Sequence, residues 1–168
     1  MEAQTKEKPV IEQPPVSLGS ETIKARRDRL LTGIDPAIIR NAWFALSHLF
    51  VPDGAQIAHI ASGDGTMTYA MAALRPRLHF IGLDKDRRTI NKARETYELD
   101  NLKFKTGDAT GETFEPESLD AVINSYALHE IYSHARYSET AVQETLKTQF
   151  QALKKEGIIF IRDYASPP

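Results

Sequence analysis

The most chemically suggestive stretch of this sequence is the loop A-S-G-D-G-T, which follows a short apolar run at residues 56–61. Gly63 and Gly65 can turn the backbone sharply and let it approach a ligand closely, because neither carries a Cβ atom. A glycine loop between a strand and a helix is typical of nucleotide sites. The dinucleotide fingerprint is incomplete, since Ala61 and Thr66 occupy two of its three glycine positions. The loop alone is therefore equally consistent with a structural turn.

Two acidic residues follow the next two predicted strands. Asp84 ends F-I-G-L-D, where an acid can bind both hydroxyls of a ribose. A helix N-cap is the alternative, although Asp86 is better placed for that role. Asp108 in G-D-A-T could accept a hydrogen bond from the amino group of adenine while the Ala109 N–H meets a ring nitrogen, or it could form a simple turn. Three signals at the ends of successive strands together favour a nucleoside site.

The elements that must position these residues alternate along the chain. A clear helix is expected over residues 35–50, where Asp35 caps the N-terminus and Pro36 takes the first position. Strands are then expected at 56–61, 79–84, 102–106, 119–124 and 157–162, and helices between them at 66–75, 86–99 and 138–155. The last helix is predicted to end at a left-handed cap on Gly157. Strands that alternate with helices indicate right-handed crossovers and a mainly parallel sheet.

One predicted strand differs from the others. Residues 102–106 read L-K-F-K-T, with strict alternation of apolar and lysine side chains. A parallel strand covered on both faces is apolar throughout, so this alternation predicts an edge strand. It fits an α/β fold with a doubly wound, mainly parallel sheet of order 3-2-1-4-5 and helices on both faces. The ligand crevice of such a sheet lies at the carboxyl ends of the strands, where strands 1 and 4 diverge.

Length and composition limit the remaining possibilities. The 168 residues suffice for one well-buried core and not for two. Residues 1–19 are predicted to be a flexible arm, residues 20–34 a short N-terminal helix or cap, and residues 35–168 the α/β domain. The absence of cysteine excludes disulfides and cysteine nucleophiles, and no histidine spacing predicts a metal site. No apolar stretch is suited to span a bilayer, so we expect no membrane association and a cytoplasmic location.

With these motifs in place, the sequence resembles the class I (Rossmann-like) S-adenosylmethionine-dependent methyltransferases. The resemblance runs from about Asp35 to Tyr164. It rests on the segments I-A-H-I-A-S-G-D-G, L-D-K-D, G-D-A, L-D-A-V-I-N-S-Y-A-L-H-E and A-L-K-K-E-G-I-I-F-I-R-D-Y. It implies that the chain uses S-adenosylmethionine as cofactor and transfers its methyl group.

The resemblance also implies roles for single residues. Gly63 and Gly65 are expected to pass under the methionine part of the cofactor. Asp84 is expected to bind the ribose, and Asp108 with Ala109 the adenine. The complete expected cofactor site consists of His59, Ala61, Ser62, Gly63, Gly65, Asp84, Lys85, Asp108, Ala109 and Asn124.

Two departures from the family pattern bear on function. His59 stands where the family usually has an acid that helps to hold the ammonium group of the cofactor. A neutral imidazole can accept such a hydrogen bond and a protonated one repels the cation, unless His59 is simply a core residue bonded to backbone. The family also usually adds two strands after the fifth, whereas this sequence stops at S-P-P. We therefore expect a truncated domain whose fifth-strand edge contacts a missing C-terminal region or a second chain.

The candidates for catalysis follow the fourth strand. Asn124 is expected beside the sulfonium and the acceptor, and Tyr126 and His129 come shortly after it. Methyl transfer mainly requires alignment of donor and acceptor, and a base is needed only for a nucleophile that keeps its proton. His129 is the best general base by its ordinary pKa, although it could equally fix the start of a helix. Asp163, after the fifth strand, is expected at the same crevice mouth.

The leading prediction is methyl transfer to an unidentified acceptor, which could be a small molecule, RNA or protein. Two alternatives stay open. One is a non-catalytic cofactor-binding or scaffold module of a larger protein, which His59, Ala61 and the missing strands suggest. The other is an aminopropyl transferase that uses the decarboxylated cofactor.

Overall fold

The computed structural model describes residues 21–164. These residues belong to two compact units, one that ends at Thr32 and one that starts at Gly33. The predicted arm at residues 1–19 lies outside the described part of the chain. The larger unit carries all the motifs and is described first.

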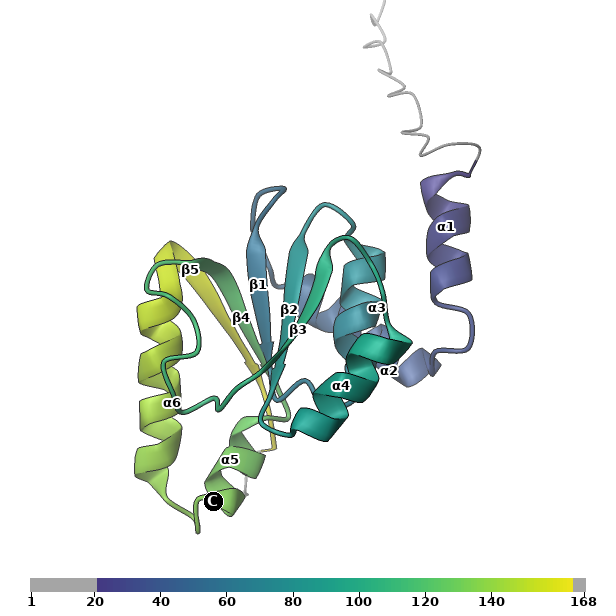
Figure 1. Ribbon diagram of the computed structural model, residues 1–168. Coiled ribbons are helices and arrows are strands. Elements are labelled where there is room, and N and C mark those ends of the chain that lie inside the picture. Colours follow the sequence, from purple (N-terminus) through teal and green to yellow (C-terminus); the bar gives the residue numbers. More distant parts are fainter. Residues whose placement is uncertain (1–20, 165–168) are drawn as a thin grey trace, which may run out of the picture. The chain divides into compact units, whose positions relative to one another are not determined.

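Five parallel strands form the single sheet of the larger unit (Figure 1). They are β1 (Gln56–Ile60), β2 (His79–Asp84), β3 (Leu102–Thr106), β4 (Leu119–Ser125) and β5 (Leu153–Arg162). Their spatial order is β3-β2-β1-β4-β5, which confirms the predicted doubly wound arrangement. The carboxyl ends of β1 and β4 therefore diverge at the point where the order reverses.

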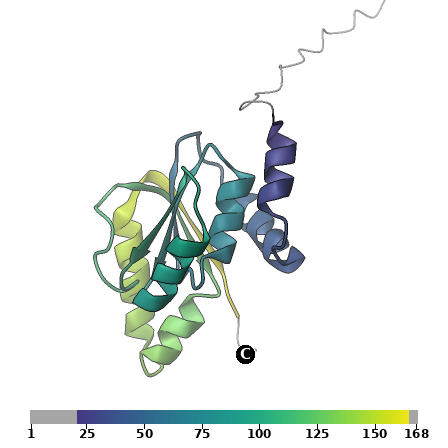
Figure 2. The same cartoon turned by 45° about the vertical axis from the view of Figure 1, so that its right-hand side comes forward.

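Helices cover both faces of this sheet (Figures 1 and 2). On one face lie α2 (Pro36–Leu46), α3 (Thr66–Leu74) and α4 (Arg87–Thr96), and on the other α5 (Leu128–His134) and α6 (Glu139–Ala152). Asp35 caps α2 by accepting a hydrogen bond from the Ala37 N–H at 2.7 Å, and Pro36 follows it as predicted. The helix ends at Leu46 rather than at residue 50, and Phe50 is exposed.

The core lies on both faces of the central strands. On β1, Ala58 and Ile60 pack in a buried cluster that includes Val122 of β4 and Ala152 of α6. The intervening His59 points to the opposite face, where it meets α3. Because side chains alternate across a strand, β1 serves both helix layers at once. This double coverage explains why the central strands are nearly continuous apolar runs.

The strand at the β3 edge agrees with the prediction from its lysines. Leu102 and Phe104 are buried, whereas Lys103 and Lys105 are exposed. Within the described residues, β3 pairs only with β2, so its outer side is a sheet edge. Exposed lysines at such an edge disfavour pairing with another strand.

The last helix is shorter than predicted. It ends at Ala152, and β5 begins at once with Leu153, whose extended conformation lets it pair with Leu119 of β4. The left-handed residue in this region is Glu156 (φ 67°), so the expected cap on Gly157 is wrong. Tertiary pairing with β4 therefore overrides the helix-end pattern K-K-E-G.

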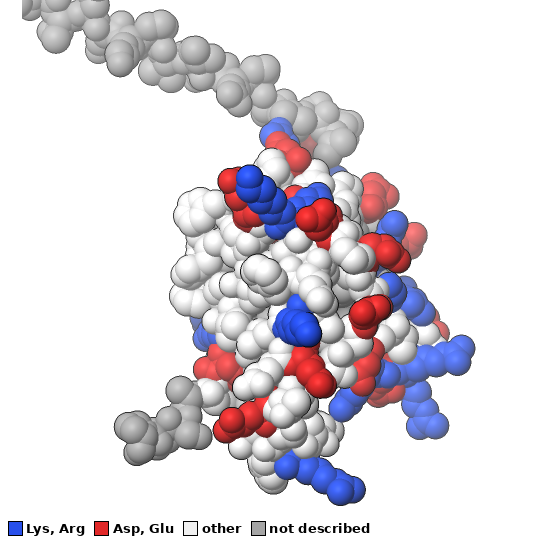
Figure 3. Space-filling view, turned by 90° about the vertical axis from the view of Figure 1, so that its left-hand side faces the viewer, with Lys and Arg blue, Asp and Glu red and all other residues white. Residues whose placement is uncertain are grey.

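The β5 strand forms the second edge of the sheet. Within residues 21–164, β5 pairs only with β4. Ile161 is half exposed there. Figure 3 shows this side of the molecule, where a broad uncharged area lies beside scattered charged side chains. Unlike β3, β5 carries few charges along its carboxyl-terminal half.

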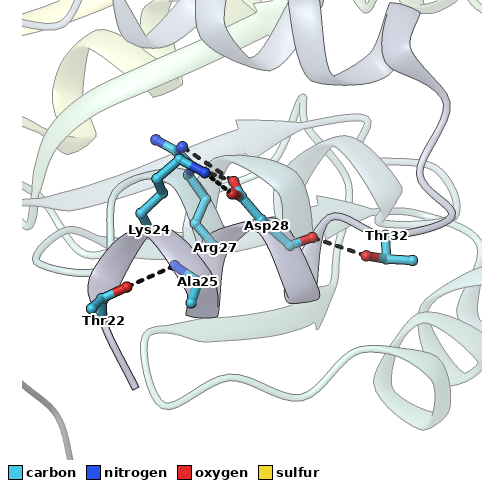
Figure 4. A network of polar contacts seen from close by, with 6 residues as sticks. All are labelled: Thr22, Lys24, Ala25, Arg27, Asp28 and Thr32. Carbon is cyan, nitrogen blue, oxygen red and sulfur yellow. Dashed lines mark hydrogen bonds and ion pairs between the residues drawn. The ribbon is translucent and has the colours of Figure 1, made fainter. Parts of the chain in front are cut away.

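The smaller unit contributes a single described helix, α1 (Ile23–Leu30), within the range where a helix is expected. Thr22 caps it by accepting a hydrogen bond from the Ala25 N–H at 3.2 Å (Figure 4). Lys24 forms an ion pair with Asp28 one turn later, at 2.6 Å. No residue of α1 is buried, so its cap and its surface ion pairs are its visible local supports.

Candidate functional site

A pocket of about 340 Å³ lies at the carboxyl ends of β1, β2 and β3. Five of the residues expected to bind the cofactor line it, and they come from three separate loops: Ala61, Asp84, Lys85, Asp108 and Ala109. The opposite wall comes from α5 and α6, with Glu130, Ile131, His134, Ala141 and Glu144 among its residues. The other expected residues are not among those that line the pocket, and each is placed below.

The glycine loop is shaped by three left-handed residues. Ala61, Gly63 and Gly65 have φ angles of 51°, 55° and 81°. A Cβ on Gly63 would point into open space, whereas one on Gly65 would lie 2.6 Å from the ring of Phe104. Gly65 is therefore required for packing, whereas the space around the Gly63 Cα is open to a ligand. Ala61 adopts a conformation that costs a residue with a Cβ about 1–2 kcal/mol.

Asp84 ties the first and second loops together. One of its oxygens, Oδ2, accepts a hydrogen bond from the Gly63 N–H at 2.9 Å, and Oδ1 accepts one from the Asp86 N–H at 2.9 Å. Asp86 itself caps α4 by accepting from the Arg88 N–H. Asp84 is thus not the helix cap. A carboxylate has about four acceptor positions, so Asp84 still has capacity for ribose hydroxyls.

Asp108 forms a local turn and still faces the pocket. Its Oδ1 accepts hydrogen bonds from the N–H and the hydroxyl of Thr110, at 2.9 and 2.8 Å. These two bonds, together with the charge of Lys85, hold the pKa of Asp108 below its ordinary value, although partial burial opposes them. Asp108 is therefore an ionised acceptor at neutral pH, which can accept a hydrogen bond from an amino group.

His59 is buried and neutral. Burial lowers its pKa to about 4, even though the charge of Asp84 acts in the opposite direction. Its Nδ1 lies 2.7 Å from the hydroxyl of Thr68 on α3, so its partner is a side chain rather than backbone. Within the described residues, His59 Nε2 and the hydroxyls of Ser62 and Ser125 are buried without a hydrogen-bond partner. Buried polar atoms are rarely left unpaired, so these atoms suit a polar ligand beside the loop.

The side chain of Asn124, at the end of β4, is fully buried. Its amide exchanges two hydrogen bonds with Gln149 of α6, at 2.8 and 3.0 Å. This pairing fastens α6 to the end of β4. It also uses one donor and one acceptor of each amide, which leaves Asn124 turned toward the helix rather than toward the pocket.

Tyr126 follows β4 in a left-handed conformation (φ 58°). Its N–H donates a hydrogen bond to the Arg162 carbonyl at 2.8 Å, and the Arg162 guanidinium lies 5.2 Å from the centre of its ring. Strained backbone of this kind is concentrated at functional sites. The hydrogen bond to Arg162, the last residue of β5, holds Tyr126 in this strained conformation.

His129 and Asp163 meet at the start of α5. Asp163 Oδ2 accepts hydrogen bonds from the N–H groups of Leu128 and His129, and Asp163 Oδ1 lies 2.6 Å from Nδ1 of His129. Burial acts to raise the pKa of Asp163, but the N–H groups of Tyr164, His129 and Leu128 and the His129 ring lower it overall. The sequence predicts both residues near the mouth of the crevice, and in the structure their side chains are in direct contact.

The charged residues in the walls of the pocket are mainly acidic. Asp84, Asp108, Glu130 and Glu144 contribute four carboxylates, against the single ammonium of Lys85. Such a pocket favours a ligand that carries positive charge. Among residues 21–164, no three His, Cys, Asp or Glu side chains come together as a metal site. In the same range, no helix combines the length and apolarity that a membrane crossing requires.

The α5 and α6 side of the pocket is predicted from the sequence only in part, through His129 at the start of α5. The segment L-H-E-I-Y-S-H directly after β4 is a usable signal, because a helix there must begin beside the crevice. Glu144 has no comparable signal, since its place depends on how α6 packs.

Comparison with known proteins agrees with this geometry. Residues 53–167 match a family model described as a methyltransferase domain. Among curated proteins, none matches the chain significantly. The chain therefore belongs to the methyltransferase-domain family, and its fold is that of the class I methyltransferases, whose methyl donor is S-adenosylmethionine.

Solved structures with the same fold include several methyltransferases. A putative methyltransferase from Haloferax volcanii, solved in complex with the activator Trm112, is 24% identical with a TM-score of 0.59, over 80% of this chain and 53% of that chain. A methyltransferase from Thiobacillus denitrificans in complex with S-adenosyl-L-homocysteine is 22% identical with a TM-score of 0.54, over 74% and 47%. The [4+2]-cyclase SpnF is 15% identical with a TM-score of 0.61, over 72% and 43%. The chain thus spans about half the length of these proteins.

Proposed function

We propose that this chain binds S-adenosylmethionine in the acidic pocket and transfers its methyl group to an acceptor at the ends of β4 and β5. The observation that carries the proposal is the convergence of Ala61, Asp84 and Asp108, from three separate loops, on one pocket of suitable charge. The bound cofactor supplies an electrophilic methyl group on a positively charged sulfur. The protein's task is then to hold the donor and the acceptor in line.

Each part of the cofactor has residues that fit it. Asp84 and Lys85 serve the ribose side, and Asp108 and the Ala109 N–H serve the adenine. Gly63 presents main chain to the methionine part, since a Cβ there would point into open space.

The polar end of the methionine part is assigned to His59 and Ser62. Their buried atoms without partners favour this assignment, because a ligand's ammonium or carboxylate group would satisfy them. Since burial keeps His59 neutral at pH 7, the imidazole does not repel the cofactor's positive charges.

The acceptor side is assigned to Tyr126 and His129. Asn124 is assigned a supporting role, because its amide is paired with Gln149 and keeps the end of β4 in place. Tyr126 supplies a hydroxyl and an aromatic face near the reacting atoms. His129 supplies a ring nitrogen that can receive a proton.

Calorimetric titration with S-adenosylmethionine and with its demethylated product tests the donor site. We expect both to bind, and we expect Asp84→Ala to weaken both by about 1–3 kcal/mol through the lost ribose hydrogen bonds. Asp100→Ala, an exposed carboxylate on the α4–β3 connection, is the matched control and should leave both affinities unchanged. A decarboxylated donor that binds better than the intact one would point to aminopropyl transfer instead.

The fold alone does not fix the reaction, as the cyclase SpnF illustrates. A binding or scaffold module without catalysis is the second candidate, and the strained Ala61 at the first glycine position favours it. Incorporation of tritiated methyl from the donor into fractionated cell extract separates the two. Cofactor binding with no incorporation into any fraction would leave only the scaffold.

The outer edge of β5 is proposed as the site where a further strand pairs, from a C-terminal continuation or a second chain. The half-exposed Ile161 and the single charged residue among residues 158–162 support this placement. An activator protein accompanies the Haloferax methyltransferase, which supports a role for partner chains. Light scattering of the purified protein and of Ile161→Lys measures self-association, which a lysine at this edge should reduce.

A further inference from the structure

The contact between His129 and Asp163 fixes which ring nitrogen of the histidine is available. Asp163 is ionised at neutral pH, because the hydrogen bonds that it accepts lower its pKa. An ionised carboxylate only accepts hydrogen bonds, so Nδ1 of His129 must carry the proton in the 2.6 Å contact. Nε2 of the neutral ring then has a free lone pair, which is the state of a general base.

The same carboxylate also has a structural role, and its two oxygens have different hydrogen-bond partners. Oδ2 accepts from the N–H groups of Leu128 and His129 and so caps the start of α5. Oδ1 contacts the imidazole and also accepts from the N–H of Tyr164 at 2.8 Å. A cap needs only one oxygen, so the bond from Oδ1 to the ring is an addition that helix capping does not require.

The pair lies at the acceptor side of the donor pocket. His129 immediately precedes Glu130 and Ile131, which line the pocket. The ring of Tyr164 lies 5.0 Å from the rings of both Tyr126 and His129. The side chain of His129 is about one-third exposed and that of Asp163 is mostly covered. The imidazole is thus accessible to an acceptor, while the carboxylate that orients it is protected.

The charge closest to Tyr126 bears on the kind of acceptor. The Arg162 guanidinium lies over the ring of Tyr126, where it favours an oxygen that becomes negative, although Glu130 next to His129 acts in the opposite direction. Thiols and carboxylic acids ionise near neutral pH without strong assistance, whereas alcohols and phenols do not. A base positioned here is therefore useful chiefly for a hydroxyl acceptor.

We propose that His129 and Asp163 form a dyad that deprotonates a hydroxyl acceptor for methylation, with Asp163 as the positioning residue. The proposal rests on the methyl transfer proposed above. His129 Nε2 takes the proton of the acceptor O–H as the oxygen attacks the methyl carbon. The carbon–sulfur bond breaks, its electron pair stays on sulfur, and the sulfonium becomes a neutral thioether. The imidazolium then releases its proton to water.

Asp163→Asn separates the two tasks of this side chain. The amide carbonyl can still accept the two N–H bonds of the α5 cap, while the amide NH₂ takes the place of Oδ1, loses the bond from the Tyr164 N–H and must donate to Nδ1 of His129. This reverses the tautomer and places the proton on Nε2. Heteronuclear NMR of the imidazole nitrogens, with His129→Gln to assign the signal, measures this directly and needs no acceptor. We expect Nδ1–H in the wild type and Nε2–H in the variant, and Nε2–H in the wild type would overturn the proposal.

Methyl transfer to paired acceptors supplies the second readout. A panel of phenols and alcohols is compared with amines of similar shape and with the corresponding thiols, which react as thiolates and need no base. We expect Asp163→Asn and His129→Gln to lower kcat for hydroxyl acceptors by about 10²–10⁴-fold. Transfer to thiols and the Kd of S-adenosylmethionine should stay within a few-fold, as they should for the control Asp100→Asn.

The outcomes distinguish this proposal from the proposed function. Equal losses with hydroxyl and thiol acceptors would show that the pair only supports the fold. Methylation of amines with no hydroxyl product in the panel would also overturn the dyad while methyl transfer itself stands. Failure of S-adenosylmethionine to bind in calorimetry would instead overturn the proposed function.

Discussion

The two sides of the crevice are built by different means. The donor side, at the ends of β1, β2 and β3, consists of loops that bond within themselves or to the next loop, as Asp108 does with Thr110. The acceptor side, at the ends of β4 and β5, depends on pairs that are distant in sequence, such as Asn124 with Gln149 and His129 with Asp163. Recognition of a common cofactor can therefore be encoded locally, whereas the acceptor site depends on how α5, α6 and β5 pack.

The largest expected effect concerns the local construction of the donor side. Gly65→Ala places a Cβ 2.6 Å from Phe104 and forces alanine to a φ of 81°, so we expect a loss of about 2–4 kcal/mol of unfolding free energy. Gly63→Ala is the matched change, with open space around its Cβ. It should cost only about 1–2 kcal/mol. Thermal or urea denaturation measures both, and equal losses would contradict the distinction.

The second prediction addresses the distant pairing on the acceptor side. Gln149→Leu leaves the buried Asn124 amide without its partner and should cost about 1–3 kcal/mol. Adding Asn124→Leu removes the unpaired group, so the double variant should recover part of this loss. Urea denaturation of the two single variants and the double variant gives the coupling energy. Additive losses would mean that the two amides are energetically independent.

The third prediction is a pH dependence that comes from His59. Its pKa is about 4 in the folded protein, below the ordinary value of 6.5, so the unfolded chain binds more protons between these values. The stability contributed by the neutral ring is complete above pH 6.5 and is lost as the pH falls toward 4. We expect wild-type stability to drop by about 1–2 kcal/mol more than that of His59→Asn between pH 7 and pH 5. If the unfolding free energies of the two proteins changed equally with pH, the buried, neutral state of His59 would be ruled out.

The smallest effect concerns the alanine that replaces a glycine in the loop. Ala61→Gly relieves the left-handed strain but increases the freedom of the unfolded chain, so the net gain should be about 0–1 kcal/mol. A Ser62→Gly variant at the neighbouring position has no such strain to relieve and should only lose stability. Differential scanning calorimetry resolves the comparison. A clear loss with Ala61→Gly would indicate that the alanine methyl contributes packing that outweighs the strain.

The sequence predicts much of the fold because most of its signals are local. Strands β2 and β3 have the predicted bounds, since their apolar patterns and the flanking Asp84 and Gly107 mark the ends. Alternating lysines also place β3 at the edge. By contrast, the predicted end of α6 is wrong by three residues. Leu153 pairs with Leu119 of β4 and so belongs to β5, and no pattern near residue 153 indicates that partner.

The same distinction applies to the candidate site. Asp84 and Asp108 can be found from their positions after strands, and they line the pocket. Glu130 can also be found in this way, since it lies in the segment that follows β4, whereas Glu144 could not, because it reaches the pocket only through the packing of α6. The pairing of His129 with Asp163 is equally hidden, since 34 residues separate them and only the order of β4 and β5 brings them together.

The bridge from Asp84 to the Gly63 N–H has a kinetic consequence. Because this bond exists before any ligand arrives, the loop needs little rearrangement to receive the adenosyl group. In the proposed function, the same preformed loop also receives the demethylated thioether product, which differs from the donor by one methyl group and one charge. We therefore expect product inhibition to be strong, and the rate of repeated turnovers in a cell to depend on how quickly that thioether is degraded.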